Sequence, residues 1–95
     1  MSSRDAYIEK LEAQLKEWSA KIAELEAKAD KAEAEARIQY SKEIKNLRKQ
    51  REELAGKLRE IQEASEDAWE ELKDGTDKMW NEFKNTFDNV VSKFK

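Results

Sequence analysis

Residues 8–25 have the sequence IEKLEAQLKEWSAKIAEL, and the spacing of their apolar side chains decides what this chain can form. The apolar positions follow at alternating steps of three and four residues and continue into an alanine-rich stretch. They are Ile8, Leu11, Leu15, Trp18, Ile22, Leu25, Ala29, Ala32 and Ala36. These steps form a heptad repeat, which places an apolar seam along one helix and favours a left-handed coiled coil. The residues between them are mostly Glu, Lys, Gln and Ala, which are strong helix formers.

The same pattern predicts that this helix is long. Residues 28–37 contain no turn former, so we expect them to continue the helix rather than to form a hairpin. After a stutter at Tyr40, heptad spacing resumes, with Arg51 at one seam position. The later apolar seam residues are Ile44, Leu47, Leu54, Leu58 and Ile61. We therefore predict one helix over residues 4–62, about 88 Å long at about 1.5 Å per residue. A shorter second helix cannot cover that length, so we expect self-association.

The last third of the chain has a different spacing. Its apolar residues advance by three, four and four, which is an eleven-residue repeat and follows a nearly straight helix. Ser65 before two acidic residues is typical of an N-cap, and Gly75 is a second candidate break. We expect an amphipathic helix over residues 66–94, joined to the first by a kink or a reversal. The predicted fold class is all-α: a long coiled-coil-type helix followed by a kinked or folded-back C-terminal helix, in one structural unit.

The C-terminal helix has large side chains on its apolar face. The residues of this face are Trp69, Leu72, Met79, Trp80, Phe83, Phe87, Val91 and Phe94. Aromatic residues on an amphipathic helix suit either a membrane interface or a protein groove. Lys73, Lys84 and Lys95 border the face, where their stems can reach lipid phosphates. Many acidic residues on the same helix oppose an anionic surface, and packing on the chain's own first helix or on a second copy is the other interpretation.

Charge is unevenly distributed along the chain. Residues 1–30 carry a net charge of −2, residues 31–62 of +3 and residues 63–95 of −4. The basic residues of the middle part are Arg37, Lys42, Lys45, Arg48, Lys49 and Arg51. This basic stripe is a candidate site for nucleic acid or anionic lipid. The stripe also fits a solvated helix face, or one that pairs with the acidic residues at positions 66–77, and we favour this interpretation. The stripe lacks interleaved aromatic residues, which makes nucleic acid an unlikely partner.

Composition excludes most catalytic chemistry. The 95-residue chain is 43% charged and 38% hydrophobic, and it has no histidine, cysteine or proline. A Ser-His-Asp or Cys-His nucleophile, a thiolate zinc site and a disulfide are therefore impossible. Pairs of carboxylates are common among the 22 acidic residues, but a thin helical rod has no cleft to separate their pKa values. We expect no enzyme, cofactor, metal or small-molecule substrate.

Several segments resemble a family of small bacterial coiled-coil proteins that are described as stress-response proteins. They are residues 4–11 (RDAYIEKL), 14–18 (QLKEW), 25–29 (LEAKA), 68–73 (AWEELK) and 94–95 (FK). The resemblance implies a role under stress and no known biochemical act. The eleven-residue repeat is more weakly similar to those of exchangeable apolipoproteins, from which the chain departs because it has no proline punctuation.

Together these features predict a non-enzymatic helical protein for self-association or protein interaction, with a stress-response role. The alternatives are a peripheral lipid-binding protein and, more weakly, nucleic-acid binding through residues 37–51. The N-terminal residues lack the apolar run of a secretory signal, so we expect a cytoplasmic location, with membrane association possible.

Overall fold

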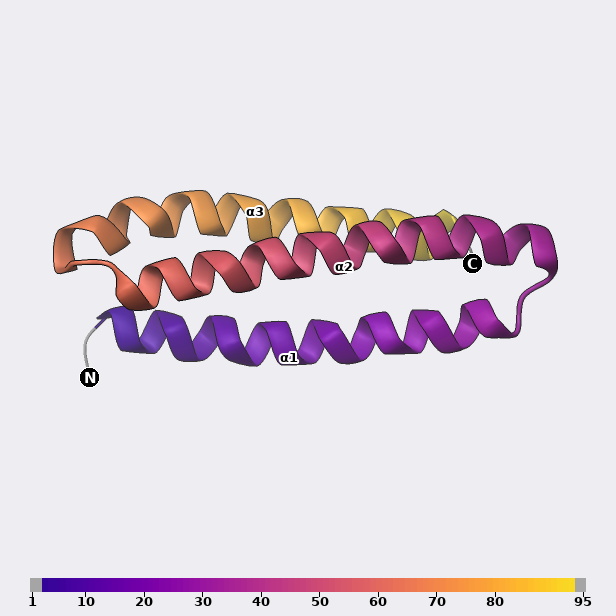
Figure 1. Ribbon diagram of the computed structural model, residues 1–95, viewed down its shortest axis with the longest axis horizontal. Coiled ribbons are helices and arrows are strands. Elements are labelled where there is room, and N and C mark those ends of the chain that lie inside the picture. Colours follow the sequence, from indigo (N-terminus) through magenta and orange to yellow (C-terminus); the bar gives the residue numbers. More distant parts are fainter. Residues whose placement is uncertain (1–2, 94–95) are drawn as a thin grey trace.

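The chain forms three helices that lie side by side in a rod. The computed structural model describes residues 3–93, which contain α1 (Ser3–Asp30), α2 (Ala34–Glu63) and α3 (Glu66–Lys93). Figure 1 shows that the helices alternate in direction, so that α1 and α3 run the same way and α2 runs opposite to both. The rod measures 50 × 19 × 18 Å. The prediction of an all-α fold is confirmed.

The first reversal shows that the prediction of one helix over residues 4–62 is wrong. α1 ends at Asp30 and α2 begins at Ala34, so residues 28–37 contain a hairpin and not a continuous helix. The backbone N–H of Lys31 donates to the carbonyl of Lys28 at 3.2 Å, and this contact closes the last turn of α1.

Packing explains why the chain turns where its sequence has no turn former. A continuous helix would leave its apolar seam in water, and each Å² of apolar surface that a hairpin buries contributes about 25 cal/mol. Ala29 and Ala36 are small, so the two helices can approach closely at the turn. The guanidinium of Arg37 donates to the carbonyl oxygens of Asp30 at 3.4 Å and Ala32 at 3.2 Å. These bonds satisfy carbonyl groups at and just beyond the end of α1.

The second reversal lies at Ala64 and Ser65. The hydroxyl oxygen of Ser65 accepts a hydrogen bond from the backbone N–H of Ala68 at 3.2 Å, which confirms the predicted N-cap. Arg4 at the start of α1 donates to the carbonyl oxygen of Ala64 and forms an ion pair with Glu66 at 3.2 Å. The turn between α2 and α3 is therefore bound to the beginning of α1.

α3 continues through Gly75 without a break, so this second candidate break is not used. Gly75 does not have a positive φ, and a Cβ atom placed on it meets no other atom within 4 Å. The helix at this point is therefore ordinary in its backbone. The eleven-residue spacing continues across Ser65, although the helix ends there. On both sides of this turn, the spacing directs the apolar residues of α2 and α3 toward one core.

The seam residues lie inside the bundle of one chain. Those that are buried are Leu11, Ile22, Leu25, Ile44, Leu47, Leu54, Leu58 and Ile61, and those that are half-buried are Ile8, Leu15 and Trp18. Arg51 is half-buried among them and donates to the hydroxyl oxygen of Ser19 at 3.5 Å. The rod is only 50 Å long, so residues 3–93 contain no helix of about 88 Å that requires self-association for its burial.

Candidate functional site

The apolar face of α3, which we considered as a lipid-binding surface, packs against the other two helices. Trp69, Trp80, Phe83 and Phe87 are buried, and Leu72, Met79 and Val91 are half-buried. Phe94 lies outside the described residues. Among residues 3–93, Ile38 on α2 is the one large apolar side chain that is exposed. Contact between the aromatic residues and lipid would therefore require the bundle to open.

Trp18 of α1 is the centre of the aromatic packing. Its ring lies edge-on to three rings of α3, with centroid distances of 5.9 Å to Trp80, 5.6 Å to Phe83 and 4.8 Å to Phe87. Edge-to-face pairs of this kind contribute about 0.5–1.5 kcal/mol each beyond the area that they bury. The ammonium of Lys21 lies 4.2 Å from the centre of the Trp18 ring and covers part of it. The sequence placed Trp18 in a seam, and packing of the C-terminal aromatic face on the chain's own first helix was one of its interpretations; the cluster shows that packing.

A second contact between α1 and α3 lies nearer their N-terminal ends. The Tyr7 hydroxyl donates to Oδ1 of Asp77 at 2.7 Å, and its ring lies 6.2 Å from that of Trp69. Lys73 lies 5.7 Å from the centre of the Tyr7 ring. Burial raises the pKa of the Tyr7 phenol above its ordinary value, and the hydrogen bond to Asp77 and the negative charges of Asp77 and Asp74 raise it further. Tyr7 therefore acts as a hydrogen-bond donor that orients α1 against α3.

The surface between α1 and α3 is the less closely packed side of the rod. α2 packs along both of its neighbours, whereas the backbones of α1 and α3 approach each other at few points. A groove of 240 Å³ lies between them, with Leu25, Phe87 and Val91 as its apolar lining. The polar residues that line it are Lys21, Glu24 and Lys28. A smaller hollow of 50 Å³, lined by Lys10, Asp77 and Trp80 among others, lies on the same side.

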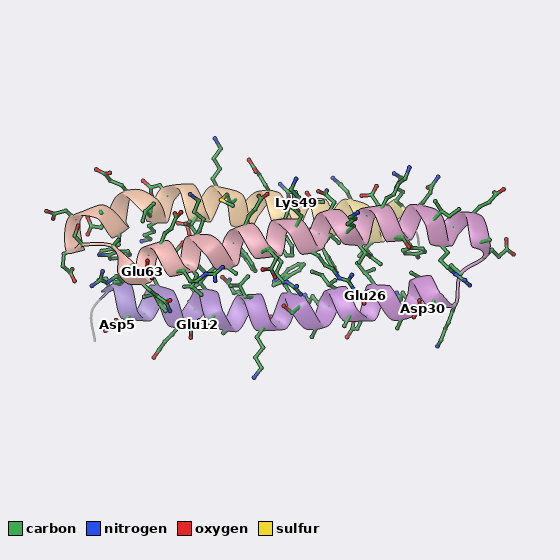
Figure 2. All side chains as sticks on the ribbon, viewed as in Figure 1. Asp5, Glu12, Glu26, Asp30, Lys49 and Glu63 are labelled. Carbon is green, nitrogen blue, oxygen red and sulfur yellow. The ribbon has the colours of Figure 1, made fainter. Side chains whose placement is uncertain are left out.

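We name this surface the α1/α3 side and define it by its borders. The α1 border consists of Lys10, Lys21, Glu24 and Lys28, which line the groove or the smaller hollow. The α3 border consists of Lys73, Asp77, Lys84 and Asp88. Lys73 and Asp77 contact Tyr7 of α1, and the other two follow them by eleven residues, or about three helical turns, and so lie on nearly the same face. Figure 2 shows that charged side chains also project from the rest of the rod.

The basic stripe on α2 divides into arginines that stabilise the fold and lysines that face solvent. Arg48 forms an ion pair with Glu26 of α1, while Arg37 and Arg51 make the contacts described above. Lys42, Lys45 and Lys49 are exposed and have no ion pair within the described residues.

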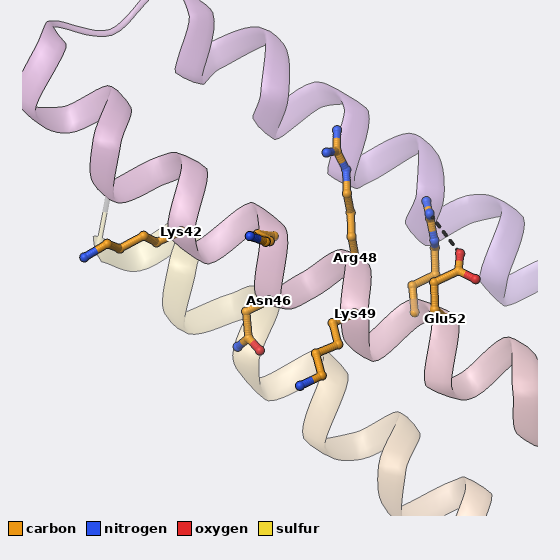
Figure 3. A pocket seen from close by; sticks show the side chains of 7 residues that line it. Lys42, Asn46, Arg48, Lys49 and Glu52 are labelled. Carbon is orange, nitrogen blue, oxygen red and sulfur yellow. Dashed lines mark hydrogen bonds and ion pairs between the residues drawn. The ribbon is translucent and has the colours of Figure 1, made fainter.

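The suggested pairing of the basic stripe with the acidic residues at positions 66–77 is not found. Because α2 and α3 are antiparallel, the basic part of α2 lies beside the C-terminal half of α3. The contacts of Gln50 with Thr86, at 3.4 Å, and of Glu43 with Lys93, at 3.5 Å, show this register. Figure 3 shows Arg48 pointing toward α1, and it shows Lys42 and Lys49 on the outer surface of α2. These residues line an open hollow of 620 Å³.

Within residues 3–93, no cluster of three or more acidic side chains is arranged to hold a metal ion. None of the three helices, over the same residues, combines the length and apolarity that a membrane span requires. No protein-family model matches the chain, and neither a curated protein nor a solved structure matches it.

Proposed function

We propose that the protein is a non-enzymatic helical interaction protein with a stress-response role, and that it binds its partner through the α1/α3 side. The observation that carries this proposal is the 240 Å³ groove between α1 and α3, whose apolar lining consists of buried Leu25 and Phe87 and half-buried Val91. Surfaces that combine an apolar centre with a polar border are typical of protein–protein contacts.

The packing of the bundle supports the choice of this side. α2 packs against both α1 and α3, and within the described residues its outer surface offers Ile38 as its single large exposed apolar side chain. The α1/α3 side instead has half-buried Trp18 and Val91 near its surface. A partner that covers this side would remove apolar area from water, which is the main driving force of association.

The stress-response part of the proposal rests on the resemblance of the segments within residues 4–29 and 68–73 to the bacterial coiled-coil family. Those segments supply much of α1 and the first turns of α3, which together form the α1/α3 side. The proposal therefore assigns the stress role and the interaction to the same surface.

A survival assay with surface variants tests the proposed function. Bacterial cells that produce the wild-type chain, Lys10→Glu or Lys45→Glu are exposed to heat, high salt or an oxidant. Both substitutions change the charge of an exposed lysine equally, but only Lys10 lies on the α1/α3 side. We expect the wild type and Lys45→Glu to protect cells and Lys10→Glu to protect them less. Equal survival with all three proteins, at equal helicity and abundance, would refute the proposal.

A second candidate function, binding of nucleic acid, is supported by the three unpaired lysines on α2. Lys42, Lys45 and Lys49 recur at steps of three and four residues, so they lie along one outer face of α2, where they line the open hollow of 620 Å³. A single helix of this kind fits the major groove of a DNA duplex. Replacing all three by Gln should abolish any binding to a labelled duplex, and it should reduce the slope of log K against log salt by about three. The matched control replaces Lys10, Lys28 and Lys84 by Gln.

A further inference from the structure

The order of charges along the α3 border has a symmetry that no ion pair within residues 3–93 uses. Lys73, Asp77, Lys84 and Asp88 alternate in sign, and the order from the C-terminal end is the same with every sign reversed. Two such helices laid antiparallel place a lysine opposite an aspartate at every position. We infer that the α1/α3 side binds a second copy of this chain, antiparallel to the first, and this inference rests on the proposed function because it names the partner for that side.

Contacts within one chain engage Lys73 and Asp77 through Tyr7, but among the described residues they pair none of the four charges with an opposite charge. Lys73 precedes Asp77 by four residues and Lys84 precedes Asp88 by four, and a base placed N-terminal to an acid is the weaker orientation of an i, i+4 pair. Neither pair forms an ion pair in the bundle. By contrast Glu17, which precedes Lys21 by four residues, does form an ion pair with it at 3.7 Å.

The charges along the α1 border also suit an antiparallel pairing of two copies. Lys10 and Glu24 are exposed, and neither has an ion-pair partner within residues 3–93. In an antiparallel pair of α1 helices that is centred on Glu17, Lys10 of each copy lies opposite Glu24 of the other. Lys21, which is paired with Glu17 in the same chain, reduces the repulsion between the two copies of Glu17 at the centre.

Both borders have the same centre, which a single two-fold axis requires. The midpoint of the α3 charges lies between Trp80 and Asn81, and the midpoint of Lys10 and Glu24 on α1 is Glu17. Trp18 and Trp80 are in contact, with ring centres 5.9 Å apart, so the two midpoints lie at one level of the rod. The axis therefore crosses the side beside these two tryptophans and places α1 on α1 and α3 on α3.

The available area is sufficient for a stable dimer. One side of a rod of 50 × 19 × 18 Å has a projected area of roughly 900 Å². A typical stable interface buries about 800 Å² on each partner. The 240 Å³ groove beside Leu25, Phe87 and Val91 supplies apolar surface away from the axis, and the axis repeats it on the second copy.

A charge exchange on α1 tests the inference with the full-length chain. Sedimentation equilibrium measures the dimer dissociation constant of the wild type, Lys10→Glu, Glu24→Lys and the double variant. Each single change creates two like-charge contacts in a symmetric dimer and should weaken it about tenfold. The double variant should recover the wild-type constant. Residues 10 and 24 are about 21 Å apart along α1, so recovery can arise only between chains.

Three results would overturn the inference: a wild-type chain that is monomeric at all concentrations, single variants that dimerise as the wild type does, or a double variant weaker than both. Lys45→Glu, on the outer surface of α2, is the control and should dimerise normally. The survival assay separates the two proposals. If Lys10→Glu loses protection while the wild type is monomeric, the α1/α3 side binds a different partner and only the inference fails. If protection never depends on this side, the proposed function fails.

Discussion

Replacing Phe83 by alanine tests whether the aromatic face of α3 is a core or a surface for lipid. Phe83 is 1% exposed, and its ring packs against those of Trp18 and Trp80, each at 5.6 Å. An aromatic side chain buries at least about 150 Å², so at about 25 cal/mol per Å² its removal costs about 4 kcal/mol. This value lies within the range of about 3–5 kcal/mol for Phe→Ala changes in protein cores. Because small domains have about 5–15 kcal/mol of stability, we expect a large loss.

Urea denaturation followed by circular dichroism and by tryptophan emission measures this loss. The control is Ile38→Ala, because Ile38 is 62% exposed on α2 and a change there should alter the free energy of unfolding by less than about 0.5 kcal/mol. Both variants are compared at one low protein concentration, so that any association contributes equally. If Phe83→Ala unfolds with the same midpoint as Ile38→Ala, the assignment of this face to the core is wrong.

Three further changes test local features of the bundle. Gly75→Ala should raise the free energy of unfolding by about 0.5–1 kcal/mol, because alanine is the better helix former and its Cβ meets nothing within 4 Å; a lower midpoint in urea would contradict this. Ser65→Ala should lower it by about 1 kcal/mol through loss of the N-cap of α3, and an unchanged midpoint would show that the cap does not contribute. The raised pKa of Tyr7 means that its protonated form is favoured in the bundle, so the stability that it adds is complete below pH 10 and is lost as the pH rises further. Absorbance at 295 nm should show a late tyrosine titration that Tyr7→Phe removes.

Periodicity predicted much of the bundle because helices bury their apolar residues at fixed spacing. The burial of Leu47, Leu54 and Ile61 follows directly from the heptad steps, and the start of α3 follows from the hydroxyl of Ser65. The turn at residues 31–33 does not follow in the same way. The residues there favour a helix, but the free energy gained by burying two apolar seams against each other exceeds this preference.

The candidate site was less accessible to sequence reasoning than the helices were. Tyr7 and Asp77 are 70 positions apart and meet only because the chain reverses twice. Without the first turn, residues 8–61 form one seam that needs an external partner. With the turn in place, the seam lies in the interior of the bundle, and the α1/α3 side is a surface that a partner can reach. The alternating charges at residues 73–88 were visible in the sequence, but their meaning depends on knowing which helix lies beside them.

The distance between residues 12 and 62 tests the central claim, that one chain folds back into a closed bundle, most directly. Nε2 of Gln62 lies 3.3 Å from Oε1 of Glu12 in the bundle, whereas a continuous helix would separate the two residues by about 75 Å. The chain has no cysteine, so Glu12→Cys with Gln62→Cys accepts two spin labels at defined places. The labelled chain is diluted with unlabelled chain to suppress contacts between copies. Pulsed electron resonance should then give one short, narrow distance distribution. A distribution near the length of the continuous helix, or a short distance that disappears on dilution, would contradict the account.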